Sequence, residues 1–313
     1  MADPPCVRLH LGELDEVRVS VARTPWPSVL TALTSVVAGP ARDVVEPLRG
    51  RVARELTGSS VAAVAPLIWP GCSVGPDCLM PVESLDGNGI QGGVELIRDL
   101  PGDHLLADLE RQFGPAPPAR WRSVMLRPRA WLHAYAGAME ETWLGVTAAW
   151  SLLRPLIERE TDRIGAAVVS GALDLVLTSI HPRARLVDNV LHLPDPEPAD
   201  YHLRGRRLVL APMISGRADG YIGNLDLPDV VWIGYGLPGH RAALAGLTDG
   251  IAAGADPLSV VLGTLRAELL RSLDHPLTMG ELADKLGCTP SQLTYHCDRL
   301  ATAGLIYRQR RGR

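Results

Sequence analysis

A row of hydrogen-bonding side chains lies near the C-terminus of the sequence. Ser291, Gln292, Thr294, Tyr295 and Arg299 fall on the polar face of a segment whose apolar residues recur every three or four positions. Hydroxyls, an amide and a guanidinium can bond to phosphate oxygens or to base edges, and glutamine can pair with adenine through two hydrogen bonds. The types and the spacing of these residues therefore predict a surface that binds nucleic acid.

A cluster of arginines follows this row: Arg308, Arg310, Arg311 and Arg313. Residues 257–313 contain eight basic and five acidic side chains, a net charge of +3, whereas the whole chain carries −4. A basic segment on an acidic chain can neutralise phosphates, although an excess of this size can also arise by chance. We predict that these arginines and Thr289 contact double-stranded DNA together with the polar row.

Two short helices are predicted to position these side chains. Thr278 to Glu281 and Thr289 to Gln292 are both capping boxes, and Pro290 suits the first position of the second helix. Apolar residues at three- and four-residue steps follow each box, and we expect them to be buried: Leu282, Ala283, Leu286, Leu293, Cys297 and Leu300.

A longer helix is expected before this pair and a strand after it. Asp256 and Pro257 form a helix start, and leucines recur at three- and four-residue steps as far as Leu273. Residues 305–307, Leu-Ile-Tyr, are expected to begin a strand. Two short helices with a tight turn between them, followed by a strand, form a winged helix-turn-helix.

The segment ELADKLGCTPSQLTYHCDRLATAGLIYRQRRGR resembles the ArsR-like winged helix-turn-helix regulators, which share the pattern ELA..LG..S...S.H...L..AGL. The resemblance covers residues 257–313, and the preceding part looks like the large domain found before such a module in some actinobacterial regulators. It implies a homodimer that binds an operator, usually as a repressor relieved by a signal. Metal-sensing members carry a cysteine pair in the helix before the turn; ELADKLG has none, so we expect no metal. Because the sequence stops at Arg313, inside the expected wing, we expect the large domain to form the dimer.

The remainder of the chain is predicted to be mainly helical, with a small antiparallel sheet. Helical periodicity covers residues 27–37, 41–56, 92–100, 103–113, 129–154 and 157–180. Strand patterns cover residues 7–10, 185–193, 201–213 and 230–235, and residues 66–89 are expected to form a loop. The fold class expected is α+β, with residues 1–250 as a sensor and dimerisation domain and residues 257–313 as the DNA-binding domain.

Five large side chains share one arc of the helix expected over residues 129–154. Trp131, Tyr135, Met139, Trp143 and Trp150 cover about 120° of its circumference. With Trp121 nearby, they are candidates for the wall of a site that binds an apolar or aromatic effector. The alternative is that they belong to the core, which is the usual role of an apolar stripe at helical spacing.

Other candidate sites have weaker patterns. His192 and His202 flank an acidic, proline-rich stretch, but their spacing matches no metal-ligand signature. Asp86 and Asn88 faintly resemble part of a calcium loop, for which a turn is the simpler interpretation. Redox pairs are conceivable for the cysteines at positions 72 and 78 and for those at positions 288 and 297.

We expect neither an enzyme nor a cofactor-binding protein. The sequence lacks a GxSxG elbow, a phosphate-binding glycine loop, an HExxH motif and a dinucleotide fingerprint. The first residues do not resemble a secretory signal, the longest apolar stretch is interrupted by Asp174, and five cysteines without a CxxC pair suggest reduced thiols. These features predict a cytoplasmic protein that does not bind membranes.

The function predicted from the sequence is transcriptional repression by a homodimer that responds to a small molecule. The alternative is a small-molecule-binding or protein-interaction protein of specialised metabolism whose helix-turn-helix serves as a scaffold.

Overall fold

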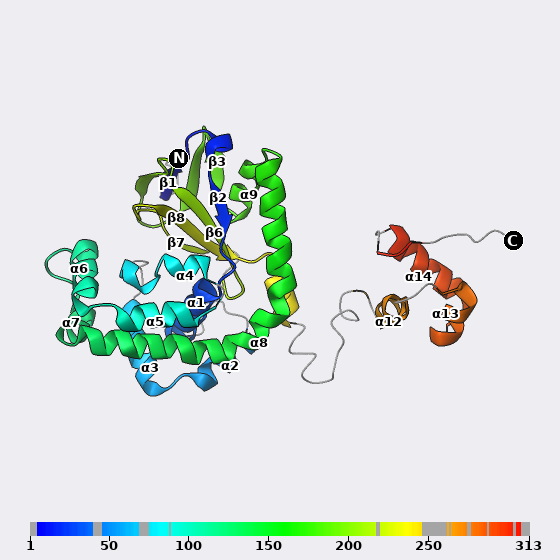
Figure 1. Ribbon diagram of the computed structural model, residues 1–313, viewed down its shortest axis with the longest axis horizontal. Coiled ribbons are helices and arrows are strands. Elements are labelled where there is room, and N and C mark those ends of the chain that lie inside the picture. The colour runs from blue at the N-terminus through cyan, green and yellow to red at the C-terminus, as the bar shows by residue number, and fades with distance from the viewer. Residues whose placement is uncertain are drawn as a thin grey trace. The chain divides into compact units, whose positions relative to one another are not determined.

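The computed structural model of the protein describes residues 5–39, 46–68, 75–87, 89–216, 220–245, 262, 264–273, 277–286, 288–302 and 305–307 (Figure 1). The chain divides into two compact units, Met1–Leu244 and Ala245–Arg313. No helix among these described residues combines the length and the apolar character that a membrane span requires.

Two four-stranded sheets lie in the first unit. The strands that the described residues form are β1 (Cys6–His10), β2 (Val19–Val21), β3 (Arg185–Val187), β4 (Val190–Pro194), β5 (Ala199–His202), β6 (Arg207–Met213), β7 (Tyr221–Asn224) and β8 (Val230–Gly236). The first sheet has the order β3-β4-β1-β5 and the second has the order β2-β6-β8-β7.

Both sheets are mixed, so the prediction of a small antiparallel sheet is wrong in its topology. β1 runs antiparallel to β4 but parallel to β5, and β6 runs parallel to both β2 and β8. Turn signals between neighbouring segments could not reveal that β1 inserts between β4 and β5, or that β2 pairs with β6 at one edge of the second sheet. β6 and β8 are buried along almost their whole length, which is typical of parallel strands covered on both faces.

Helices form the other layers of the first unit. They are α1 (Trp26–Ala38), α2 (Glu46–Glu55), α3 (Gly58–Val64), α4 (Glu83–Asp86), α5 (Gln91–Asp99), α6 (Gly102–Phe113), α7 (Arg122–Leu126), α8 (Pro128–Val169) and α9 (Leu173–Ser179). Short 3-10 turns connect them: η1 (Leu14–Glu16), η2 (Ala65–Leu67), η3 (Asp77–Leu79) and η4 (Ala119–Trp121). The predicted loop over residues 66–89 therefore contains short helical turns.

The long helix α8 replaces two helices that the sequence predicted separately. It continues through Pro155, and Figure 1 draws it as two runs that meet at a bend. Proline lacks the N–H that would bond to the preceding turn, which is the usual cause of such a bend. The helix therefore continues past Pro155 and does not end there.

The first run of α8 organises a helical core, because α1, α2, α3 and α5 all pack on it. The closest approach is at Gly145, where an added Cβ would lie 2.7 Å from Cα of Val52 on α2. On α5, a Cβ on Gly93 would lie 2.5 Å from the indole ring of Trp26. The missing side chains of these two glycines allow the neighbouring elements to pack this closely.

A second core connects the two sheets with the end of α8 and with α9. Leu9 and Leu191 from the first sheet, Leu210 and Ile233 from the second, and Ile164 from α8 are buried in it. The opposite face of the second sheet lies towards α1: Ile214, just after β6, donates its backbone N–H to Ser28 Oγ at 3.1 Å.

The second unit contains α12 (Thr264–Ser272), α13 (Met279–Leu286) and α14 (Pro290–Thr302). The predicted inward positions of α13 and α14 share one core with Leu269 of α12. Residues 305–307, which were expected to begin a strand, pair with none of the described residues. The expected helix start at residues 256 and 257 lies outside the described residues.

Candidate DNA interface and candidate ligand cavity

The helix-turn-helix begins at the capping box that the sequence predicted. Oγ1 of Thr278 accepts the N–H of Glu281 at 3.3 Å, and Glu281 Oε2 accepts the N–H of Thr278 at 2.8 Å. This reciprocal pair satisfies two donors at the start of α13. At the other end of α13, the N–H of Cys288 donates to the carbonyl of Ala283 at 3.2 Å and closes the helix before the turn.

Helix α14 separates an apolar face from a polar one. Leu293, Cys297 and Leu300 are buried against α12 and α13. Tyr295 is 56% exposed, and Thr294 is also exposed. The part of the polar row that the structure describes therefore stands on the surface, where a DNA groove could meet it.

The predicted DNA contacts fall into two sets. Thr289 and Arg299 are exposed, like Thr294 and Tyr295. The side chains of Ser291 and Gln292 lie outside what the structure describes. So do the whole residues Arg308, Arg310, Arg311 and Arg313.

Sequence reasoning missed a polar connection that supports the exposed tyrosine. Arg266 of α12 donates from Nε to Nδ1 of His296 at 3.2 Å, and the His296 ring packs edge-to-face on Tyr295 with centroids 5.2 Å apart. This contact links α12 to the exposed face of α14. The only signal in the sequence was a polar residue at the border between the two faces of α14.

A cavity of about 500 Å³ lies in the first unit. Helix α1 forms one side, η3 forms a second, and the edge strand β7 with β8 forms a third. Leu30, Met80, Ile222 and Trp232 provide apolar surface within it. Its volume is that of a site for a drug-sized molecule.

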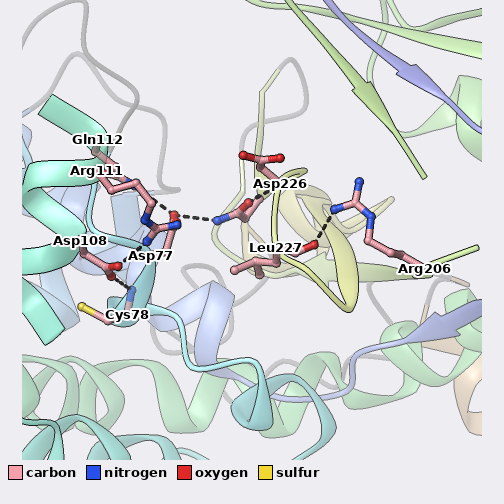
Figure 2. A network of polar contacts seen from close by, with 9 residues as sticks. Asp77, Cys78, Asp108, Arg111, Gln112, Arg206, Asp226 and Leu227 are labelled. Atoms are coloured by element: carbon pink, nitrogen blue, oxygen red, sulfur yellow. Dashed lines mark hydrogen bonds and ion pairs between the residues drawn. The ribbon is translucent and has the colours of Figure 1, made fainter. Parts of the chain in front are cut away.

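Asp77 anchors the η3 wall of this cavity (Figure 2). Its Oδ1 accepts from Gln112 Nε2 at 3.0 Å and from Asn224 Nδ2 at 2.6 Å, and its Oδ2 lies 2.9 Å from Arg111 Nη1. Burial raises the pKa of Asp77 above its ordinary value, and the Arg111 guanidinium partly opposes that shift. Three elements thus meet at one carboxylate: η3, α6 and β7.

Arg111 also pairs with a second carboxylate, that of Asp108. The other oxygen of Asp108 accepts the backbone N–H of Cys78 at 2.7 Å. Figure 2 shows Arg111 between the two aspartates, so one guanidinium serves two carboxylates. Burial raises the pKa of the Cys78 thiol, which disfavours its reactive thiolate form.

The loop after β7 is held by contacts of its own. Oδ1 of Asn224 accepts the N–H of Asp226 at 2.8 Å, and Arg206 Nη1 donates to the carbonyl of Leu227 at 2.5 Å (Figure 2). Asn224 therefore fixes both its own loop and, through Asp77, the opposite wall of the cavity.

Asp195 supplies a second carboxylate to the cavity, from the connection between β4 and β5. Its Oδ2 accepts from the Tyr221 hydroxyl at 3.1 Å, and its Oδ1 accepts the N–H of Glu197 at 2.9 Å. Burial, together with the negative charge of Asp195, raises the pKa of the Tyr221 phenol, so the phenol remains a donor.

Trp232 on β8 contributes a donor without an acceptor. The residue is 4% exposed, it lines the cavity, and its indole N–H has no hydrogen-bond partner among the described residues. A buried donor left unpaired costs about 1–3 kcal/mol. An occupant of the cavity that offered an oxygen to this N–H would remove that cost.

The predicted aromatic wall does not line this cavity. Trp121, Tyr135 and Met139 are buried in the helical core. Trp131 is also buried there, and its indole N–H donates to the carbonyl of Ala63 at 2.8 Å. Burial therefore favours the core interpretation for these four residues.

The remaining two members of the arc lie nearer the surface. Trp143 and Trp150 are half-buried, and their rings pack edge-to-face with centroids 6.5 Å apart. They do not line the cavity either.

The structure separates most of the weaker candidate sites. His192 on β4 lies 3.7 Å from Cys6 Sγ, whereas His202 on β5 stacks on His10. Within the described ranges, no group of three or more His, Cys, Asp or Glu side chains could hold a metal ion. Both carboxylate oxygens of Asp86 pair with Arg207 at 2.9 Å. Residues 72 and 88 lie outside the described residues.

Comparison with known proteins agrees with the geometry of the second unit. Its three helices, with a capped turn and an exposed polar row, have the form of a helix-turn-helix that binds DNA. Residues 267–312 match the MarR family. No curated protein and no solved structure matches the chain.

The C-terminal segment is thus a winged helix-turn-helix of the kind that transcription regulators use to bind DNA. The match supports the winged helix-turn-helix class that the sequence predicted, whereas the ArsR-like family itself is not confirmed.

Proposed function

We propose that this chain is a cytoplasmic, homodimeric transcriptional repressor. Its second unit binds an operator through α14, and its first unit binds a small molecule that releases the DNA. The observation that carries the proposal is the exposed polar row of α14 above a core shared with α12 and α13. The proposal includes no catalytic step, in keeping with the absence of nucleophile and cofactor motifs from the sequence.

DNA contact in this proposal follows the usual geometry of the class. The second helix of the motif enters the major groove with its N-terminal residues leading, which assigns Thr289, Thr294 and Tyr295 to the groove. The arginines at the end of the chain would neutralise phosphates and so raise affinity for any sequence.

The small-molecule part of the proposal is supported by the cavity of the first unit. Its volume of about 500 Å³ is sufficient for an effector, and its apolar walls carry a few fixed polar groups. The aromatic arc around Trp131, which the sequence suggested for this role, lies mainly in the core.

The homodimer in this proposal forms through the first run of α8. Residues 142–153 contain no charge, and Leu144 and Leu152 are 65% and 37% exposed there. Glu141 precedes this stretch and Arg154 follows it, so a second copy laid antiparallel would bring opposite charges together at both ends. An exposed apolar face of this kind is typical of an interface.

Sedimentation of the full chain tests the homodimer. We expect a dimer that Leu144→Glu converts to a monomer, whereas Leu126→Glu, a matched change at an exposed residue of α7, leaves it intact. Equal sedimentation of the two variants would reject this surface.

Selection of DNA fragments by the purified full chain tests the repressor proposal, with each enriched fragment then measured in a gel-shift. We expect a two-fold symmetric sequence whose half-sites lie about one helical turn apart. Enrichment of no sequence, with weak binding to all fragments, would reject operator binding and leave the scaffold alternative.

A further inference from the structure

The cavity of the first unit has an excess of negative charge. Asp77 and Asp195 line it, and Asp226 lies in the loop that Asn224 holds. The Arg111 guanidinium beside Asp77 is shared with Asp108, which leaves this trio with one net negative charge. Asp195 adds another, since it accepts from the neutral Tyr221 hydroxyl and from the backbone N–H of Glu197.

The carboxylates near the cavity also act on a neighbouring tyrosine, Tyr201. Burial raises the pKa of the Tyr201 phenol, and Asp226, Asp195, Asp77 and Glu197 raise it further. The negative charges of four carboxylates thus all disfavour ionisation of this phenol. A cation that entered this region would be attracted by the same carboxylates.

Two other features of the cavity indicate which groups, besides a cation, an occupant should have. Leu30, Met80 and Ile222 offer apolar contacts, so the occupant needs an apolar body. The indole N–H of Trp232 is a donor without an acceptor among the described residues, so the occupant needs an oxygen. The indole ring can also attract a cation through its face.

We propose that this cavity binds an organic cation: an amine on an apolar body that carries a carbonyl oxygen. The ammonium group lies near Asp195, and the carbonyl accepts a hydrogen bond from Trp232. The role of this ligand as the effector rests on the repressor function proposed above, whereas the binding itself does not.

Three probes that differ in charge test the proposal by calorimetry on the full chain without DNA. Procainamide is an aromatic amide with a cationic amine; its neutral analogue replaces the amine nitrogen by CH; 4-aminohippurate is an aromatic amide with a negative charge. We expect procainamide to bind at least tenfold more tightly than the neutral analogue, and 4-aminohippurate not to bind. Equal binding of the first two, or no binding of procainamide at 1 mM, about the weakest affinity of interest, would overturn the proposal.

Two variants locate the binding. Asp195→Asn keeps an acceptor for Tyr221 but removes the charge, and we expect about tenfold weaker procainamide binding with little change for the neutral analogue. Asp188→Asn, the same change at an exposed turn residue outside the cavity, is the matched control. Equal procainamide affinities of the two variants would place the cation elsewhere and reject the site.

Trp232→Phe tests the hydrogen bond to the carbonyl. This variant keeps an aromatic ring but loses the N–H, so procainamide should bind about fivefold more weakly, as expected for one neutral hydrogen bond. An analogue of procainamide with CH2–CH2 in place of its CO–NH keeps a single cationic amine but lacks the carbonyl, so it should bind wild type and Trp232→Phe equally. A loss of affinity for both compounds would instead mean that the variant disturbs the cavity, and it would reject the assigned contact.

Gel-shifts with procainamide separate this inference from the repressor proposal. If procainamide binds as expected but changes no DNA complex, the cavity assignment stands and the effector role fails. If DNA is bound specifically but none of the probes binds, the repressor function stands and the cation assignment fails.

Discussion

The two candidate sites of this protein are built in different ways. In the second unit, the polar row of α14 lies on an exposed face, and the contacts that hold its helices join residues close in sequence, such as Thr278 and Glu281. In the first unit, the cavity depends on contacts between distant segments, such as Asp77 with Asn224.

Because of this difference, substitutions should affect binding and stability independently in the second unit but together in the first. Exposed side chains on α14 can be replaced with little loss of packing, so their substitution should change DNA affinity alone. Residues around the cavity also hold η3, α6 and β7 together, so their substitution should change stability as well as binding. Substitutions in the two units should therefore differ in how they change stability and binding.

Gly145→Ala should produce the largest change in stability. Its Cβ would lie 2.7 Å from Cα of Val52 and 2.9 Å from its backbone N, so α2 or α8 must shift. Overpacking of this kind costs about 1–3 kcal/mol, more than the helix propensity gained. Chemical denaturation should detect the loss in the first unit.

Gly137→Ala is the matched control in the same helix. No atom lies within 4 Å of its added Cβ, so the substitution should stabilise α8 by up to about 1 kcal/mol. If both variants have the same free energy of unfolding, the close contact between α2 and α8 is not as described.

Thr278→Ala should lower the stability of the second unit by about 1 kcal/mol, because the N-cap acceptor of α13 is lost. Thr294→Ala is its counterpart on the exposed face, where the Thr294 hydroxyl donates to the carbonyl of Pro290 in its own helix at 2.8 Å. In thermal melts, Thr278→Ala should lower the melting temperature more than Thr294→Ala does. In DNA-binding measurements, Thr294→Ala should lower the affinity more than Thr278→Ala does. Similar melting temperatures for the two would remove the distinction.

Asp77→Asn should give the smallest effect, visible as a pH dependence. Burial raises the folded-state pKa of Asp77, so the folded protein holds this proton to higher pH than the unfolded chain does. Wild-type stability, relative to Asp77→Asn, should therefore fall as the pH rises from about 4 through the raised pKa. Urea denaturation at a series of pH values measures the difference, and a rise with pH would mean that the Arg111 ion pair outweighs burial.

The sequence predicted α13 and α14 well because their signals are local. A capping box, a turn and apolar residues three or four apart lie within one short segment. The cavity lacked such signals. Asp77 lies in a predicted loop. Asn224 lies in β7, where Gly223 and Asn224 are poor strand formers, and this segment becomes a strand by pairing with β8.

The aromatic arc illustrates another limit of periodicity. The spacing of Trp131, Tyr135 and Met139 correctly indicated one face of a helix, but it could not indicate what that face meets. The structure surrounds these side chains with α3 and the η3 segment: Trp131 donates to Ala63, and the Tyr135 hydroxyl lies 3.5 Å from the carbonyl of Leu79. Long-range packing, which the sequence does not reveal, decided between core and ligand wall.

Fluorescence anisotropy with a selected operator measures whether the polar row of α14 makes the specific DNA contacts. Replacing Ser291, Gln292, Thr294 and Tyr295 together with alanine should abolish specific binding, because base contacts are worth about 1–3 kcal/mol each. The melting temperature and the helical circular dichroism should remain close to those of the wild type, since the described members of this set lie on the exposed face of α14. A folded variant that binds the operator with wild-type affinity would show that these four side chains do not contact the DNA.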